Sequence, residues 1–201
     1  MFYDALKGDH GLAHDPVNAL VAPRPIGWIS SLDSNGVRNL APYSYFNLVA
    51  SHPPVVMFAS GTVKDTQRNI EATGEFVCNI ADWNLREEMN RSSAPLPPDV
   101  DEFDFAGLEA EPSTRVKPPR VKRALAALEC RYFKTVALPS ATEKPHVFSL
   151  VLGLVVGIHI DDRVIRDGIV DVTKIRPLAR LGYMDFAVVN DVFEMLRPTG
   201  G

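Results

Sequence analysis

The predicted fold depends on residues 36–70, GVRNLAPYSYFNLVASHPPVVMFASGTVKDTQRNI. A polar, turn-rich segment over residues 39–47 is followed by an apolar run over 55–59, and then by a short loop with a lysine over 60–64. A helix is expected to begin at residues 65–66, because Asp and Thr are favoured at helix starts. This order predicts a strand that ends at a helix N-terminus, where free backbone N–H groups favour an anion.

A β-hairpin is predicted immediately before the apolar run. Residues 26–32 and 37–41 are apolar segments separated by a turn at residues 33–36, Asp-Ser-Asn-Gly, in which Asn and Gly tolerate a positive φ. Pro42 is expected to end this pairing, because proline has no N–H to donate to a neighbouring strand. Residues 43–49 are therefore interpreted as partly loop.

After the apolar run, a short helix and another strand are predicted. The helix is expected over residues 66–73, with Asp65 or Thr66 as its cap and Gly74 at its end, and the strand over residues 75–80. The helix would thus begin where the anion site is predicted.

The second half of the chain is less regular. Residues 92–119 are rich in Pro, Ser and acidic side chains, and a segment of this length is better interpreted as a cover over part of the protein than as a linker. Residues 121–129 leave both helix and strand open, since helix-favouring residues run into a strand-like segment over 130–138. A long β-rich run follows over 146–160, and residues 177–183 are interpreted as loop.

Together these elements predict a mainly β fold. We count seven or more strands and two or three short helices, with hairpin turns and no regular βαβ alternation. This pattern favours an antiparallel β-barrel with a few short peripheral helices over a doubly wound sheet. The 201 residues are enough for one core, so we expect a single domain over residues 1–201.

Composition excludes several classes of function. The formal net charge is −4 and the isoelectric point is near 5.7, which argues against nonspecific binding of nucleic acid. The longest apolar stretch, residues 147–160, is interrupted by polar residues and glycines and is shorter than the roughly 20 residues that span a bilayer. The first fifteen residues lack a basic start followed by an apolar run, so we expect a cytoplasmic protein without membrane contact.

Most sequence motifs of enzymes are absent. The chain contains no GxGxxG, GxxxxGK[ST], GxSxG or HExxH motif, and its five histidines show no metal-ligand spacing. Cys78 and Cys130 lie in apolar, strand-like contexts, which favours buried, reduced thiols over catalytic ones. We therefore predict neither a catalytic side chain nor a metal site.

The loop before the predicted helix has the donors that a phosphate needs. Ser60, Thr62 and Thr66 supply hydroxyls, Lys64 supplies a cation, and Gly61 lets backbone N–H groups approach closely. The alternative is an ordinary helix cap, because Ser, Thr and Asp commonly precede helices for that reason alone.

The polar segment around Pro42 is a second candidate site. Where a proline interrupts a strand, neighbouring backbone donors and acceptors leave the sheet, and a planar heterocycle could pair with them. The alternative is an ordinary irregularity of an edge strand, and the residues themselves leave both interpretations open.

An ordered set of segments resembles the flavin reductase-like family of FMN-binding split barrels, in the branch of flavoredoxins and flavoprotein oxygenases. The segments extend over about residues 20–185. They are Arg24-Pro25-Ile26, Trp28-Ile29-Ser30-Ser31, Asn39-Leu40-Ala41-Pro42-Tyr43-Ser44, Pro53-Pro54-Val55-Val56, Lys64-Asp65-Thr66, Glu75-Phe76-Val77-Cys78-Asn79, Leu128-Glu129-Cys130, Val155–His159 and Pro177-Leu178-Ala179-Arg180-Leu181-Gly182.

The resemblance implies an antiparallel Greek-key split β-barrel that forms a homodimer and holds FMN. It implies phosphate contacts from Ser60, Lys64 and Thr66, and a ring edge lined by the backbone of Asn39, Leu40, Ala41, Pro42 and Ser44. Ser30 and Ser31 would lie near the ribityl chain or the ring, and Arg180 would contribute from the late loop. The family often has a Tyr or His after a late glycine; here Tyr183 follows Gly182 directly and no histidine follows.

The resemblance also implies redox chemistry that belongs to the flavin. The activity it implies is that of an NAD(P)H-dependent flavin reductase, in which flavin accepts hydride from the nicotinamide. Two alternatives stay open: an FMN electron carrier reduced by a protein donor, and a split barrel that binds flavin without catalysis.

Overall fold

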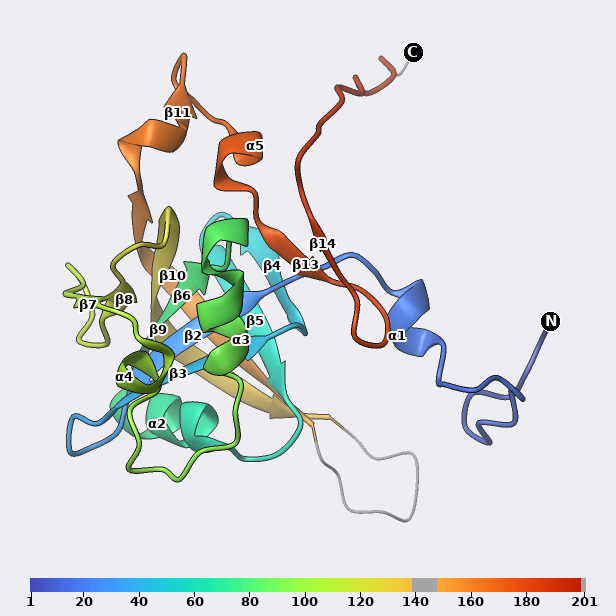
Figure 1. Cartoon of the computed structure of the whole chain (residues 1–201), viewed down its shortest axis with the longest axis horizontal. Coiled ribbons are helices and arrows are strands. Elements are labelled where there is room, and N and C mark those ends of the chain that lie inside the picture. The colour runs from blue at the N-terminus through green and yellow to red at the C-terminus, as the bar shows by residue number, and fades with distance from the viewer. Residues whose placement is uncertain (139–147, 200–201) are drawn as a thin grey trace.

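A seven-stranded antiparallel sheet forms the body of the protein (Figure 1). The computed structural model describes residues 1–138 and 148–199. The strands of this sheet occur in the order β3-β2-β6-β9-β10-β5-β4. Their bounds are β2 Gly27–Leu32, β3 Arg38–Tyr43, β4 Phe46–Ser51, β5 Pro54–Ser60, β6 Glu75–Ile80, β9 Ala126–Ala137 and β10 Ser149–Ile160. The mainly β, antiparallel fold that the sequence predicts is therefore confirmed.

Smaller elements surround this sheet. A three-stranded sheet joins β1 (Arg24–Pro25), β13 (Leu178–Arg180) and β14 (Phe186–Val188), and short two-stranded ladders pair β7 (Ala110–Glu111) with β8 (Arg120–Val121) and β11 (Ile165–Arg166) with β12 (Ile169–Val170). The helices are short: α1 Val17–Leu20, α2 Asp65–Thr73, α3 Arg86–Arg91, α4 Glu102–Ala106 and α5 Val172–Ile175, with 3₁₀ turns at Trp83–Leu85 and Asp162–Val164. Figure 1 shows both termini extending away from the barrel.

The predicted hairpin of β2 and β3 is confirmed, but Pro42 does not end it. Trp28 pairs with Pro42, and the ladder runs on to Tyr43. The backbone N–H of Leu40 donates to the Glu102 carboxylate rather than to β2, so this edge strand turns alternate N–H groups outward. Position 42 has the same outward orientation, and a proline there costs no ladder hydrogen bond.

Four other segments can be compared with their predictions. Residues 43–49 are loop only in part, since β4 begins at Phe46. For residues 121–129, where the sequence leaves helix and strand open, the structure has strand from Ala126 onward, because β9 pairs on both sides, with β6 and β10, which overrides helix propensity. Residues 177–183 contain β13, which is held between β1 and β14. The long run predicted over 146–160 is β10 from Ser149 onward; residues 146–147 lie outside the described part of the chain.

Helix α2 begins one residue earlier than predicted. Lys64 is its N-terminal boundary residue and no side chain caps the helix, so Asp65 and Thr66 do not have the predicted cap role. Gly74 ends the helix as predicted: it adopts φ 77°, and its N–H donates to the Ile70 carbonyl over 2.8 Å. The first backbone N–H groups of α2 are thus left without a side-chain acceptor.

Two apolar clusters lie on the two faces of the sheet. Successive side chains of β2 point to opposite faces of the sheet. Trp28 belongs to the cluster beneath α3 and α4, and Ile29 belongs to the cluster inside the barrel. Both cysteines are free and belong to the inner cluster, which confirms buried, reduced thiols. Strand β3 contributes to both clusters, through Leu40 and Tyr43, so its position is firmly determined on both sides.

Candidate functional site

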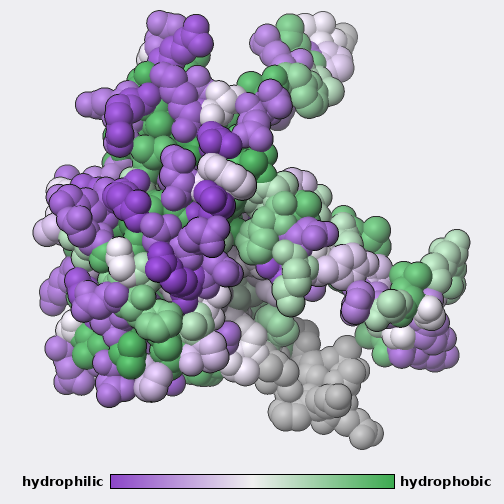
Figure 2. Space-filling model, viewed as in Figure 1, coloured by the Kyte–Doolittle hydropathy of each residue, from purple (hydrophilic) through white to green (hydrophobic). Residues whose placement is uncertain are grey.

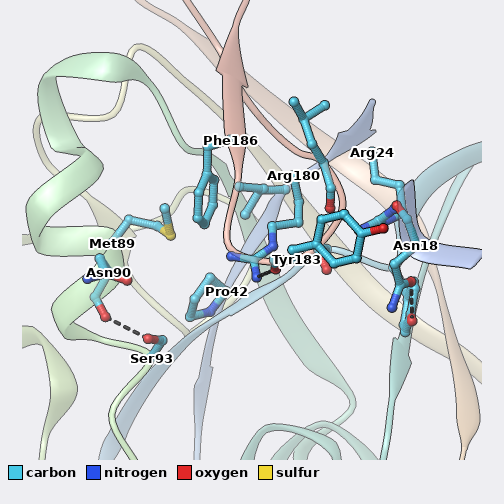
Figure 3. Close-up of a pocket in the computed structure, with 13 residues that line it drawn as sticks. Asn18, Arg24, Pro42, Met89, Asn90, Ser93, Arg180, Tyr183 and Phe186 are labelled. Carbon is cyan, nitrogen blue, oxygen red and sulfur yellow. Dashed lines mark hydrogen bonds between the residues drawn. The ribbon is translucent and has the colours of Figure 1, made fainter. Parts of the chain in front are cut away.

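Two cavities flank the edge strand β3. We call the first the helix-end cavity, and it measures about 410 Å³. It is lined by Asn39, Ala41, Tyr43, Val63, Lys64, Asp65, Thr66, Arg68, Ser92, Ser93, Ala94, Pro95, Leu96, Pro98 and Glu102. The second, the loop-end cavity, measures about 290 Å³ (Figure 3) and is lined by Asn18, Arg24, Ile26, Pro42, Ser44, Tyr45, Met89, Asn90, Ser93, Arg180, Leu181, Tyr183 and Phe186. Odd-numbered residues of β3 face the first and Pro42 faces the second. Ser93 lines both cavities, so they meet at the edge of the strand.

The helix-end cavity contains a cation without a counter-charge. Lys64 lies at the N-terminus of α2, and its ammonium makes no hydrogen bond or ion pair within the part of the chain that the structure describes. The neighbouring Arg68 is different, because its guanidinium is paired with Asp65. The uncapped helix end adds free N–H groups and a favourable dipole. These donors suit an oxyanion.

A buried hydroxyl in the same cavity also lacks a partner. Tyr43 is only 8% exposed, and its hydroxyl makes no hydrogen bond in the described structure. Burial raises the pKa of the Tyr43 phenol. The hydroxyls of Thr66 and Ser60 lie near the phenol and partly offset this rise, but both donate elsewhere, to Asn39 and to the Thr62 carbonyl, and neither is hydrogen-bonded to Tyr43. The phenol is therefore neutral at physiological pH and can donate its proton. Because buried polar groups are nearly always satisfied, the unpaired Tyr43 hydroxyl is an unusual feature of the cavity wall.

Behind Lys64, a buried network fixes the wall of the cavity. The Thr66 hydroxyl donates to Asn39 Oδ1 over 2.7 Å, and the Ser31 hydroxyl donates to the same oxygen over 3.2 Å. Asn39 Nδ2 in turn donates to Glu102 Oε1 over 3.0 Å, which determines the orientation of the amide. Ser31 thus acts from behind Asn39 and does not line the cavity.

Glu102 is an acidic residue of this otherwise anion-favouring cavity. Its two carboxylate oxygens accept from the Asn39 side chain and the Leu40 backbone. Burial raises the pKa of the Glu102 carboxyl, while these donors lower it in part. Both oxygens of the Glu102 carboxylate therefore accept hydrogen bonds from within the protein, and these bonds link α4 to β3.

The structure brings together some of the predicted site residues and not others. Asn39, Ala41, Lys64 and Thr66 line the helix-end cavity, and Pro42, Ser44 and Arg180 line the loop-end cavity. The other four are buried behind the walls. Ser60 donates to the Thr62 carbonyl and shapes the loop, Ser30 donates to the Pro119 carbonyl, Ser31 supports Asn39, and the Leu40 side chain is in the core.

Several lining residues were not predicted from the sequence. Tyr43 has no role of its own in the sequence-based prediction, and Glu102 and Ser93 lie in the segment over 92–119 that the sequence predicts to be a cover. That interpretation is supported, because residues 92–96 line the helix-end cavity. The partners of this segment could not be read from the sequence, since they lie some 60 residues away on β3.

Figure 3 shows Arg180, Phe186 and Tyr183 converging on the loop-end cavity. The Arg180 guanidinium stacks on the Phe186 ring, 4.5 Å from its centroid, and donates to the Tyr183 carbonyl. Tyr183 adopts a φ of 56°, so the chain turns sharply after Gly182. Arg180 has no carboxylate partner among the described residues, which leaves this end of the cleft positively charged.

The described residues contain no helix that is long and apolar enough to cross a membrane. In the same ranges no group of three or more His, Cys, Asp or Glu side chains is close enough to hold a metal ion.

Comparison with known proteins places this chain in a family. A family model described as a flavin reductase like domain matches residues 20–178. The chain belongs to the flavin reductase-like family. A curated relative from Aquifex aeolicus, of uncharacterized function, is 37% identical over 172 residues, which cover 83% of this chain and 84% of the relative.

Solved structures of the family show the same architecture. The nitrilotriacetate monooxygenase component B from Bacillus cereus superposes with a TM-score of 0.89 at 30% identity, covering 97% of this chain and 98% of that one. A protein with a split barrel domain from Shewanella frigidimarina superposes with a TM-score of 0.82 at 22% identity and 90% coverage of both chains. The expected split-barrel fold is confirmed, and the family match agrees with a flavin as cofactor.

The unpaired Tyr43 hydroxyl can be tested without any ligand. We expect Tyr43→Phe to leave the free energy of unfolding of the flavin-free protein unchanged, or to raise it by about 1 kcal/mol, because no hydrogen bond is lost. Urea unfolding measures this. A loss of stability larger than about 1 kcal/mol would show that the hydroxyl has a partner within the protein.

Proposed function

We propose that this protein binds FMN along the edge of β3 and acts as an NAD(P)H-dependent flavin oxidoreductase. The phosphate would occupy the helix-end cavity and the ring the loop-end cavity, with the ribityl chain passing the edge of the strand near Ser93. The observation that supports this most strongly is the set of unused donors in one cavity: the Lys64 ammonium, the Tyr43 hydroxyl and the uncapped N-terminus of α2.

The contacts refine the role of each predicted residue. Thr66 already donates its hydroxyl proton to Asn39, so we assign its phosphate contact to the backbone N–H of the first helical turn. The Leu40 N–H is bonded to Glu102, which leaves the backbone beyond it, at Pro42 and Ser44, to face the ring. Ser30, Ser31 and Ser60 would act indirectly, by holding the walls.

Bound flavin supplies the redox chemistry, since it accepts hydride from a reduced nicotinamide. The residues of this chain would bind the flavin, orient it and exclude water. Arg180 lies at the ring end without a carboxylate partner among the described residues, so its charge would favour electron-rich groups there. No side chain is assigned as a general acid or base.

An adjoining cavity offers an approach for the electron donor. It measures about 390 Å³, shares Met89, Asn90, Arg180 and Phe186 with the loop-end cavity, and is otherwise lined by Trp83, Arg86, Glu87, Leu178 and Met184. Its apolar and basic lining suits a flat molecule with an anionic group. Its position beside the proposed ring end supports a role for the second substrate.

The proposed activity is tested by anaerobic reduction of the FMN-loaded protein with NADH and, separately, with NADPH. We expect loss of the yellow flavin colour with at least one of them within seconds. If neither nicotinamide reduces the flavin, whereas a reduced ferredoxin does, the protein is an electron carrier and the proposed reductase activity is wrong.

The phosphate assignment is tested with Lys64→Ala. We expect FMN affinity to fall about tenfold, close to 1.5 kcal/mol, the lower end for a charge-assisted hydrogen bond because Lys64 is exposed to solvent. Fluorescence titration with FMN measures this. Lys117→Ala, another exposed lysine outside both cavities, serves as the matched control and should bind like the unmodified protein. Unchanged FMN affinity in Lys64→Ala would remove Lys64 from the site.

A homodimer is the second part of the proposal. Strand β4 is an edge strand that exposes Leu48 and Val49 by half or more, and both arms of the chain carry exposed apolar residues such as Phe2 and Phe193. Figure 2 shows these arms with apolar side chains, in green, projecting from the barrel. Soluble monomers rarely leave so much apolar surface uncovered, which supports a second copy as the cover.

Light scattering coupled to size exclusion tests the dimer. We expect twice the 22.1 kDa chain mass for the unmodified protein and a shift toward the monomer for Leu48→Lys, because a charge would enter the interface. A monomer at micromolar concentration would contradict this part of the proposal.

A further inference from the structure

The N-terminal segment and the late loop are locked together beside the loop-end cavity. We call this unit the clasp; it consists of residues 14–24, which include α1, and residues 180–186, which join β13 to β14. Figure 1 shows α1 against the turn between β13 and β14, although the two segments are about 160 residues apart in sequence. Together they supply Asn18, Arg24, Leu181 and Tyr183 to the cavity wall.

Arg24 is the centre of the clasp. Its guanidinium donates to three backbone carbonyls: Nη1 to Asn18 O over 2.6 Å and to Val21 O, and Nη2 to Leu181 O over 2.8 Å. The side chain is about nine-tenths buried and has no acidic partner within the described residues. Only an arginine offers several donors in one rigid plane, so this residue can hold two separate segments at once.

A close backbone contact supports the same junction independently. Gly182 approaches Ala19 so closely that a Cβ at position 182 would lie 2.5 Å from the Ala19 Cβ and 2.7 Å from its Cα. The glycine is needed here for space, because any larger residue would push α1 away from the loop. His14 also contacts Tyr183, with ring centroids 5.5 Å apart.

The clasp is connected to the rest of the cleft through Tyr45. The Tyr45 hydroxyl donates to Asn18 Oδ1 over 2.8 Å, and the Arg24 guanidinium lies 5.7 Å from the centre of the Tyr45 ring. Tyr45 follows Ser44 directly, at the end of β3 that faces the loop-end cavity. Figure 3 shows Arg24, Asn18 and Tyr183 on the same side of this cavity.

We propose that Arg24 is a positioning residue that closes the ring end of the flavin cleft by fastening the N-terminal segment to the loop carrying Tyr183. This inference rests on the proposed function, because it assigns the loop-end cavity to the ring. Arg24 need not touch the flavin. Its effect would be to keep the wall formed by Asn18, Leu181 and Tyr183 in place and so to shield the ring from water.

The test compares FMN with riboflavin, which has the same ring but no phosphate. For Arg24→Met we expect the dissociation constants of both flavins to rise by the same factor, about tenfold or more, whereas Lys64→Ala should weaken the binding of FMN alone.

At saturating riboflavin, iodide should quench the bound flavin more strongly in Arg24→Met than in the unmodified protein. If Arg24→Met only loosened the packing of the protein, its melting temperature would fall, but iodide would quench the bound riboflavin no more strongly than in the unmodified protein. Arg163→Met, at an exposed arginine paired with Asp161, is the matched control and should change neither constant.

A second variant keeps the proposal testable if Arg24→Met folds poorly. Gly182→Ala leaves Arg24 in place but forces the loop from α1, because the new Cβ would meet the backbone Cα of Ala19 as well as its Cβ. We therefore expect weaker binding of both flavins.

The outcomes separate this inference from the proposed function. Unchanged riboflavin binding in folded Arg24→Met, or in folded Gly182→Ala, would overturn the role of the clasp and leave the FMN site intact. If the unmodified protein binds neither flavin, the proposed function and this inference both fail.

Discussion

The outer edge of β3 determines the arrangement of the cleft. One side of this strand is bonded to β2, and its other side turns backbone groups outward. Glu102 accepts from the Leu40 N–H and the Asn39 side chain, so the segment over residues 92–119 is fastened to the first part of the edge. The part at Pro42 and Ser44 stays open to the loop-end cavity. The strand therefore lies between the two cavities, and they meet at its outer edge, where Ser93 lines both.

The helix-end cavity depends on a helix that has no cap. In many helices a side chain satisfies one of the first N–H groups, but here the Thr66 hydroxyl is used by Asn39, and no other side chain of the described residues caps the helix. Lys64 and the buried Tyr43 hydroxyl are likewise unpaired among the described residues, and the proposed ligand would supply their acceptors. The stability that this arrangement gives up in the free protein would be recovered when an oxyanion binds.

Sequence patterns were sufficient where the cause of a structure is local. The hairpin turn at residues 33–36, the helix end at Gly74 and the strand β6 follow from turn residues, a glycine and an apolar run, and each is in place. Lys64 and Thr66 were found as a cluster of donors beside a helix start, and they line the same cavity.

What the sequence did not reveal depends on contacts between distant segments. A proline interrupts a strand only where its nitrogen faces a neighbouring strand, which would need a hydrogen bond from it. Pro42 lies on an edge strand with its nitrogen facing outward, and this depends on the order of the strands in the sheet. Residues 121–129 leave helix and strand open by themselves, and two flanking strands make them part of β9 from Ala126 onward. Ser30, Ser31 and Ser60 match a family motif, yet their side chains are committed to the interior. The unpaired hydroxyl of Tyr43 and the three carbonyl partners of Arg24 arise from contacts in the folded chain, and no local pattern in the sequence predicts them.

The most direct test of the central claim is a crystal structure of the protein with FMN. We expect the phosphate at the N-terminus of α2, within hydrogen-bond distance of Lys64 Nζ and the Tyr43 hydroxyl, and the ring beside Pro42 and Ser44. A phosphate bound away from α2, with the Tyr43 hydroxyl still unpaired, would contradict the account.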